Sequence, residues 1–142
     1  MTPNNKLDLV IDTNALLVSV PNRSTYHWFY LALLKKQFKA FVTTEILSEY
    51  EEVIGNRLSP YVASSTIRTL IELDNVIPIT TYFKYQLIQA DPDDDKFVNC
   101  AICANAHYIV THDRHFDVLK TIDFPKIKTA TLSEIKKLLD FE

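Results

Sequence analysis

Acidic residues surround a short apolar segment of the chain, residues 91–113, which reads DPDDDKFVNCAICANAHYIVTHD. A cluster of aspartates opens it: Asp91, Asp93, Asp94 and Asp95. Aspartate caps helix N-termini, and the helix dipole favours negative charge there, so the pattern predicts a helix from Lys96 that ends at Asn105. A strand rich in β-forming residues is predicted over residues 107–110, and it ends close to Asp113. One acid therefore begins a helix and another follows a strand.

A second acidic residue follows a predicted strand near the start of the chain. Residues 6–11 form a nearly continuous apolar run that ends in Asp12, Thr13 and Asn14. In an α/β fold the carboxyl ends of parallel strands share one edge of the sheet, where such folds bind ligands. Asp12 and Asp113 are expected at that edge. Each alone is more often a turn residue than a ligand, since aspartate is common in turns.

A metal site becomes the better interpretation when the acids are taken together as Asp12, Glu49, Asp95 and Asp113. Mg²⁺ and Mn²⁺ prefer oxygen ligands, and Mg²⁺ commonly binds through one or two carboxylates, several waters and a substrate phosphate. One or two such ions could activate a water for in-line displacement at phosphorus. Zinc and redox chemistry are less favoured, because Cys100 and Cys103 lie inside an apolar helix and have no histidines at an established ligand spacing.

Strands and helices alternate along the chain. Helices are expected over residues 15–20, 26–39, 43–54 (ended by Gly55), 60–73, 82–89, 96–104 and 131–139, with a helical turn over 116–119. Strands are expected over residues 6–11, 41–42, 76–79, 107–110 and 127–129. Parallel strands need crossover connections, so the expected fold class is α/β: three α/β/α layers around a mostly parallel sheet of about four or five strands.

Composition limits the function classes. The 142 residues suit one domain, residues 1–142, and an apolar fraction of 47% can fill its core. A net charge of −3 excludes a nucleic-acid binder that works by overall basic charge, although a metal or a local basic patch could still contact phosphates. With two cysteines, a polar start and no long apolar run, we expect a cytoplasmic protein without a membrane span.

Three segments resemble the PIN domain family, and the resemblance spans nearly the whole chain. They are LDLVIDTNALLVSV, TTEILSEYEEV and DPDDDKFVNCAICANAHYIVTHDRHF. In this register the family's metal-site acids match Asp12, Glu49, Asp95 and Asp113, with Asp94 as an adjacent alternative. Its polar residues that hold the carboxylates by hydrogen bonds match Thr13, Asn14 and Thr111. The chain departs from the family pattern at two positions, each of which lacks the usual glycine: Asn105 ends the helix, and His112 precedes the last acid.

The resemblance implies a Mg²⁺- or Mn²⁺-dependent endoribonuclease that hydrolyses RNA phosphodiester bonds with metal-activated water. Many small PIN proteins resemble toxins of toxin–antitoxin pairs, often dimeric, so a protein antitoxin and a homodimer are expected partners. Few basic residues lie near the acids, which favours single-stranded or looped RNA over duplexes. Lys96, His112 and Arg114 are candidate substrate contacts, and a solvated rim is their alternative role.

Other functions remain open at this stage. A phosphatase with an aspartyl nucleophile would need a second aspartate where Asn14 stands. A catalytically silent PIN-like module that binds RNA or protein would have little reason to keep all four acids, since crowded carboxylates are costly without a cation. A housekeeping RNA-processing nuclease would use the same site residues as a toxin.

Overall fold

A five-stranded parallel sheet forms the centre of the computed structural model, which describes residues 6–81, 94–123 and 126–140. The strand order is β3-β2-β1-β4-β5, so β1 is central. The strands are β1 (Asp8–Ile11), β2 (Lys39–Val42), β3 (Val76–Pro78), β4 (Tyr108–Val110) and β5 (Thr129–Ala130). The chain moves outward from β1 to β3 and then crosses to β4. Such a reversal of direction is where open α/β sheets bind ligands.

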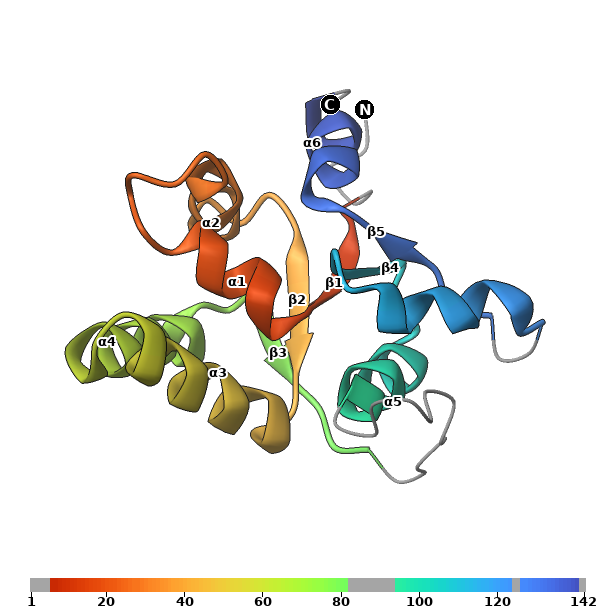
Figure 1. Ribbon diagram of the computed structural model, residues 1–142, viewed down its shortest axis with the longest axis horizontal. Coiled ribbons are helices and arrows are strands. Elements are labelled where there is room, and N and C mark those ends of the chain that lie inside the picture. The colour runs from red at the N-terminus through yellow and green to blue at the C-terminus, as the bar shows by residue number, and fades with distance from the viewer. Residues whose placement is uncertain (1–5, 82–93, 124–125, 141–142) are drawn as a thin grey trace.

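Helices cover both faces of this sheet, which confirms the three-layer α/β/α prediction. They are α1 (Thr13–Ser19), α2 (His27–Leu34), α3 (Thr44–Arg57), α4 (Pro60–Glu72), α5 (Asp95–Ala104) and α6 (Leu132–Asp140), with a 3-10 helix, η2 (Arg114–Thr121). Figure 1 shows α1 to α4 gathered on one side of the sheet and α5 on the other.

The helix ends follow local rules that the sequence displays. The side chains of Thr43 and Ser59 accept hydrogen bonds from the N–H groups of the first turns of α3 and α4. Asn105 ends α5 in the left-handed conformation, with φ of 54°, as predicted. At the start of α6, Thr131 and Glu134 each accept the backbone N–H of the other, which is a capping box.

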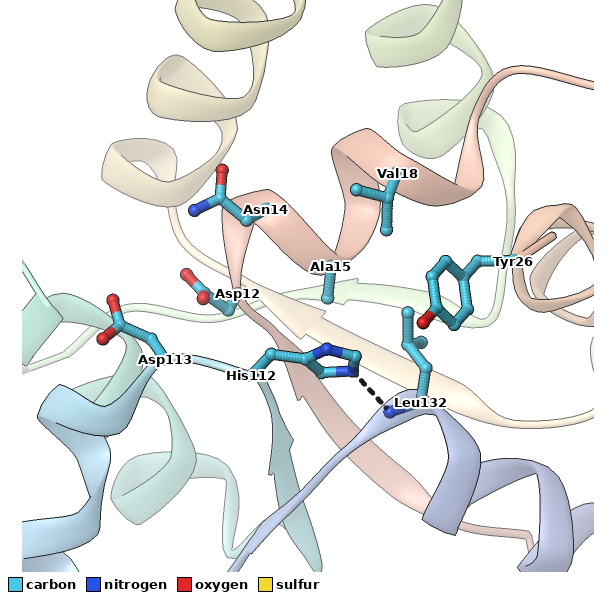
Figure 2. A pocket seen from close by; sticks show the side chains of 8 residues that line it. All are labelled: Asp12, Asn14, Ala15, Val18, Tyr26, His112, Asp113 and Leu132. Carbon is cyan, nitrogen blue, oxygen red and sulfur yellow. Dashed lines mark hydrogen bonds between the residues drawn. The ribbon is translucent and has the colours of Figure 1, made fainter. Parts of the chain in front are cut away.

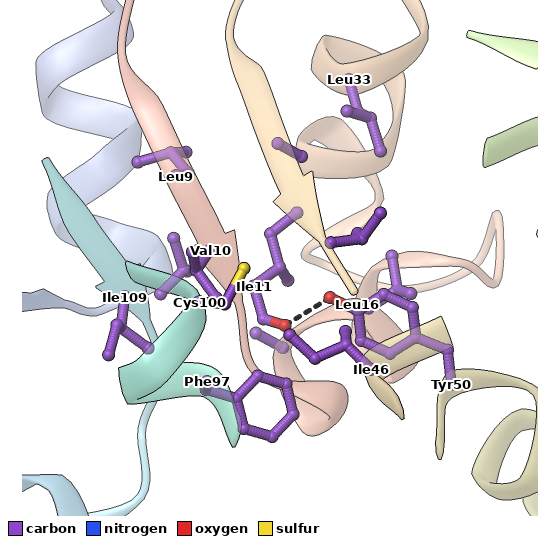
Figure 3. Packing of buried hydrophobic residues seen from close by; sticks show 14 of the residues in the cluster. Leu9, Val10, Ile11, Leu16, Leu33, Ile46, Tyr50, Phe97, Cys100 and Ile109 are labelled. Carbon is purple, nitrogen blue, oxygen red and sulfur yellow. Dashed lines mark hydrogen bonds between the residues drawn. The ribbon is translucent and has the colours of Figure 1, made fainter. Parts of the chain in front are cut away.

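The core explains why β1 reads as an unbroken apolar run. Leu9, Val10 and Ile11 are all at most 3% exposed, because helices pack against both faces of the strand. Figure 3 shows Phe97 and Cys100 of α5 on one side of β1 and Leu16, Ile46 and Tyr50 on the other. Both cysteines were expected in the core; Cys100 is a core residue, whereas Cys103 lies on the exposed side of α5.

Several predicted boundaries need correction. The helix expected over residues 26–39 ends at Leu34, because Lys36 adopts a left-handed φ of 62° and the chain turns into β2. Gly55 does not end α3, which continues to Arg57; a Cβ at this position would only touch that of Ala63 on α4, at 3.6 Å. The first helix begins at Thr13 and the last strand is Thr129–Ala130. The helix expected over residues 82–89 lies outside the described residues. Within the described residues, no helix is long and apolar enough to cross a membrane.

Candidate active site

The ends of β1 and β4 bring two of the predicted acids together. These strands pair in parallel, and the N–H of Asp12 donates to the carbonyl of Val110 at 3.0 Å. One residue beyond, the hydroxyl of Thr111 donates to Oδ2 of Asp12 at 2.8 Å and accepts the N–H of Asp113 at 3.0 Å. A single threonine thus positions both aspartates at the carboxyl edge of the sheet.

Glu49 reaches the same edge from α3. The neighbouring Tyr50 is fully buried, and its hydroxyl donates to the carbonyl of Ile11 at 2.5 Å, which fixes α3 against the end of β1. One oxygen of Glu49 accepts a hydrogen bond from the hydroxyl of Thr13. The other lies 2.5 Å from Nζ of Lys96, the second residue of α5. Three elements, α1, α3 and α5, therefore meet at one carboxylate.

Asp12 is the most buried of the three acids at this edge, with 6% of its surface exposed. Burial raises the pKa of its carboxyl group, and the charges of Asp113 and Glu49 raise it further. Hydrogen bonds from the Thr111 hydroxyl and the Thr13 backbone act in the opposite direction without cancelling the effect. A negative charge on Asp12 is therefore unfavourable in the metal-free site. A bound cation would reduce this cost.

An open cleft of about 300 Å³ lies over these acids. Its described lining residues are Asp12, Thr13, Asn14, Glu49, Val53, Asn56, Arg57, Asp94 and Asp113. Asp95 does not line it and is 9% exposed at the start of α5, whereas the partly exposed Asp94 does line it. The other two aspartates of the cluster, Asp91 and Asp93, lie outside the described residues.

A second hollow, of about 250 Å³, adjoins the cleft on the α1 side and shares Asp12, Asn14 and Asp113 with it. Its other lining residues are Ala15, Val18, Tyr26, His112 and Leu132 (Figure 2). The acidic cleft therefore continues into a chamber with mostly apolar walls.

The model of the PIN domain family matches residues 8–115, more than half of the chain. The chain belongs to the PIN domain family. A search of curated proteins finds no match.

Solved structures agree with this PIN assignment at the level of fold. VapBC2 from Rickettsia felis, bound to a promoter DNA fragment, gives a TM-score of 0.61 at 18% identity, over 88% of this chain and 98% of that one. DNA-bound VapBC from Salmonella typhimurium gives a TM-score of 0.57 at 18% identity, over 89% of this chain and 98% of that one. VapC20 from Mycobacterium tuberculosis, a Sarcin-Ricin loop cleaving toxin, gives a TM-score of 0.56 at 10% identity, over 77% of this chain and 92% of that one.

The candidate substrate contacts of this PIN domain occupy different positions. Lys96 reaches Glu49, with 13% of its side chain exposed. His112 lines the second hollow, where its Nε2 accepts the N–H of Leu132 at 3.1 Å, so the ring also ties α6 to the sheet edge. Arg114 is exposed at the start of η2.

Seven lining residues were missed from the sequence: four aliphatic ones, Ala15, Val18, Val53 and Leu132, and three with polar groups, Tyr26, Asn56 and Arg57. Arg57 had a usable signal, because Glu49, Val53 and Arg57 recur every four residues and so share one face of α3. Tyr26 had none, since it precedes α2 and reaches the site only through the packing of α1, α2 and α6.

The donors of this PIN site fit a hard cation that keeps part of its water shell. All the acids and Asn14 offer oxygen, which suits Mg²⁺ and Mn²⁺. Across residues 6–81, 94–123 and 126–140, no three acid, histidine or cysteine side chains are grouped closely enough to enclose an ion. Mg²⁺ commonly uses one or two carboxylates and several waters, so an open acidic cleft is compatible with it.

Proposed function

We propose that this PIN domain is a Mg²⁺- or Mn²⁺-dependent endoribonuclease that hydrolyses phosphodiester bonds of single-stranded or looped RNA. The observation that carries the proposal is the convergence of Asp12, Asp113 and Glu49 on one cleft, with Asp12 buried. Negative charges crowded in this way repel one another, so the group is costly to keep charged unless a cation joins it.

One or two ions would be held by Asp12, Glu49, Asp95 and Asp113, with Asp94 as the adjacent alternative ligand. When bound, such ions activate water and neutralise charge that develops at phosphorus. Thr111 and Thr13 orient Asp12 and Glu49 through the hydrogen bonds described above. Asn14 lies on the rim of both hollows and is assigned the same supporting role.

Cations around the cleft provide the contacts to RNA phosphates. Arg57 lines the cleft itself, and Lys96 lies against Glu49 at its edge. Arg114 and His112 extend this set on the β4 side. This small number of positive charges would bind a duplex weakly, whereas an unpaired strand can bring a single phosphate into the cleft.

The biological setting that we propose is a cytoplasmic toxin–antitoxin pair, with a protein antitoxin and a homodimeric toxin. Its support is the similarity in fold to chains of VapBC complexes from two organisms and to VapC20. A housekeeping RNA-processing nuclease is the second candidate, supported by a fold similar to that of the PIN domain endonuclease Utp24, at a TM-score of 0.55 and 13% identity.

The deciding experiment incubates the purified protein with structured RNA in Mg²⁺, Mn²⁺ or EDTA and maps the product ends. We expect cleavage only with metal, and products with a 5′-phosphate and a 3′-hydroxyl, because attack by water does not need the ribose 2′-hydroxyl. Asp12→Asn is the inactive control. Cyclic 2′,3′-phosphate ends, or equal cutting in EDTA, would contradict the proposal.

A further inference from the structure

The hollow beside the acidic cleft has the composition of a site for a flat, partly apolar group. Ala15, Val18 and Leu132 supply aliphatic surface, and Tyr26 supplies an aromatic ring. Val18 keeps 38% of its surface exposed. At about 250 Å³ the space is smaller than pockets for drug-sized ligands, which begin near about 300 Å³. It suits one ring system.

The His112 ring is held by a hydrogen bond before any ligand arrives, and it packs against the ring of Tyr26. His112 and Tyr26 meet edge to face, with ring centroids 5.9 Å apart and an interplanar angle of 87°. The backbone N–H of Tyr26 donates to the hydroxyl of Ser24 at 3.0 Å, and the N–H of Leu132 donates to Nε2 of His112 at 3.1 Å. The His112 ring would therefore lose little side-chain freedom when a ligand binds against it.

His112 also offers a hydrogen-bond donor. Because its Nε2 accepts the N–H of Leu132, that nitrogen carries no proton, and in the neutral ring the proton is on Nδ1. Figure 2 shows the Nδ1 side of the ring turned toward Ala15 of the hollow. Ring nitrogens and carbonyl oxygens of nucleobases accept such a hydrogen bond.

The hollow is continuous with the proposed site of phosphate hydrolysis, since Asp12, Asn14 and Asp113 line both. On this basis we infer that the hollow lined by Val18, Tyr26 and His112 binds the unpaired nucleobase of a nucleotide next to the scissile phosphate. This inference rests on the proposed function. It makes Tyr26 and Val18 specificity-determining residues, and it requires the base to be unstacked, which a duplex resists.

The test compares an intact RNA substrate with matched RNAs that lack the base on either side of the cleaved bond. Base–aromatic stacking in single-strand binding sites changes binding enough that the wild type should cleave the intact RNA about tenfold or more faster than one of the two abasic RNAs. Val18→Phe fills the hollow, and Tyr26→Ala removes its ring. In both variants the ratio of the two cleavage rates, intact RNA over abasic RNA, should fall toward one. Cleavage of the intact RNA slows in these variants, mainly because its KM rises.

Two matched controls separate this effect from general damage. Val118→Phe alters a valine of similar exposure, 41%, on η2, and Tyr61→Ala alters a tyrosine that is 81% exposed on α4. Both controls should keep the wild-type ratio, and thermal unfolding should show that all four variants fold. If the wild type cleaves both abasic RNAs as fast as the intact one, or if Val18→Phe and Tyr26→Ala keep the ratio, the inference is wrong while the nuclease proposal stands.

A binding measurement covers the case in which no RNA is cleaved and the proposed function fails. Fluorescence anisotropy in Mn²⁺ compares a labelled single-stranded RNA with a fully abasic strand of the same length. Tighter binding of the base-containing strand that Val18→Phe abolishes would support the base site without catalysis. Equal binding of the two strands, or no binding of either, would overturn the inference.

Discussion

The hydroxyl of Thr111 donates a 2.8 Å hydrogen bond to Oδ2 of Asp12 across 99 positions of the sequence. The bond joins the ends of β4 and β1, the two neighbouring strands between which the strand order reverses. The same oxygen of Thr111 accepts the N–H of Asp113. One buried hydroxyl therefore fixes the orientation of one carboxylate and the backbone that carries a second.

Thr111→Val should reduce cleavage without abolishing it. Valine preserves the shape and suits the strand end, but it removes both hydrogen bonds. Partners of this kind around a metal site change affinity or activity by about 10- to 100-fold, so activity should recover partly at high Mn²⁺. The measurement is cleavage rate against Mn²⁺ concentration.

A matched control is Thr69→Val on α4, where the hydroxyl donates to the carbonyl of Ser65 on an exposed surface. It should cleave like the wild type. Complete inactivity of folded Thr111→Val at saturating metal would instead assign Thr111 a direct contact with metal or substrate.

Asp12→Asn should change how the stability of the metal-free protein depends on pH. Burial raises the pKa of Asp12 above its ordinary 3.8, so the native state holds this proton more tightly than the unfolded chain. The free energy of unfolding therefore falls as pH rises from about 3.8 through the raised pKa, and asparagine removes this loss. In EDTA the variant should gain stability relative to the wild type between pH 4 and pH 7.

Thermal unfolding at several pH values measures this difference, at about 3 °C for each ~1 kcal/mol in a chain of this size. The variant should also lose most of the rise in Tm that Mn²⁺ gives the wild type, because one ligand is missing. A constant difference in Tm across the pH range would contradict the role assigned to burial.

The parts of the fold that follow from residue pattern were predictable. The apolar runs in the sequence predicted β1 and β4, and with them the positions of the acids that follow each strand. A buried parallel strand has no polar face, so it ends where polar residues begin. Asn105 ended α5 through a property of its own side chain. These features are local, and Asp12 and Asp113 met because both obey the same rule.

The parts that depend on packing between distant segments were not predictable. Lys36 adopts a left-handed φ without being glycine, and Gly55 stays inside α3, since neighbouring segments overrule local preference. The meeting of Lys96 with Glu49 depends on how α3 and α5 are placed around β1. Which of two adjacent aspartates faces the cleft depends on the first turn of α5, where pattern gives a boundary only within one or two residues.

Lys96→Met should strengthen the response to metal and weaken cleavage. The ammonium group lies 2.5 Å from Glu49, with side chains 13% and 28% exposed, so its loss leaves a half-buried carboxylate with only the Thr13 hydroxyl among the partners described above. The metal-free protein should lose about 1–2 kcal/mol, a cost between those of surface and buried pairs. Mn²⁺ should restore more stability than in the wild type, because it takes over the role of the lost charge.

The control is Lys120→Met, whose exposed pair with Asp117 spans 3.6 Å and should contribute little. Thermal shifts with and without Mn²⁺ measure the first effect, and cleavage rates measure the second. An Mn²⁺ response equal to that of the wild type would show that Lys96 does not compete with metal for Glu49.

Asp94→Asn and Asp95→Asn should separate the two aspartates at the start of α5. The register of the family motif assigns the metal to Asp95, whereas Asp94 is the one that lines the described cleft. If Asp95 is a ligand, Asp95→Asn abolishes both cleavage and the metal-induced rise in Tm, and Asp94→Asn keeps part of each. Asp95 also lies in the first turn of α5, where its charge favours the helix, so its loss should cost the metal-free protein a further ~0.5 kcal/mol. Isothermal calorimetry with Mn²⁺ on both variants decides the order, and a larger loss of affinity in Asp94→Asn would move the ligand role to that residue.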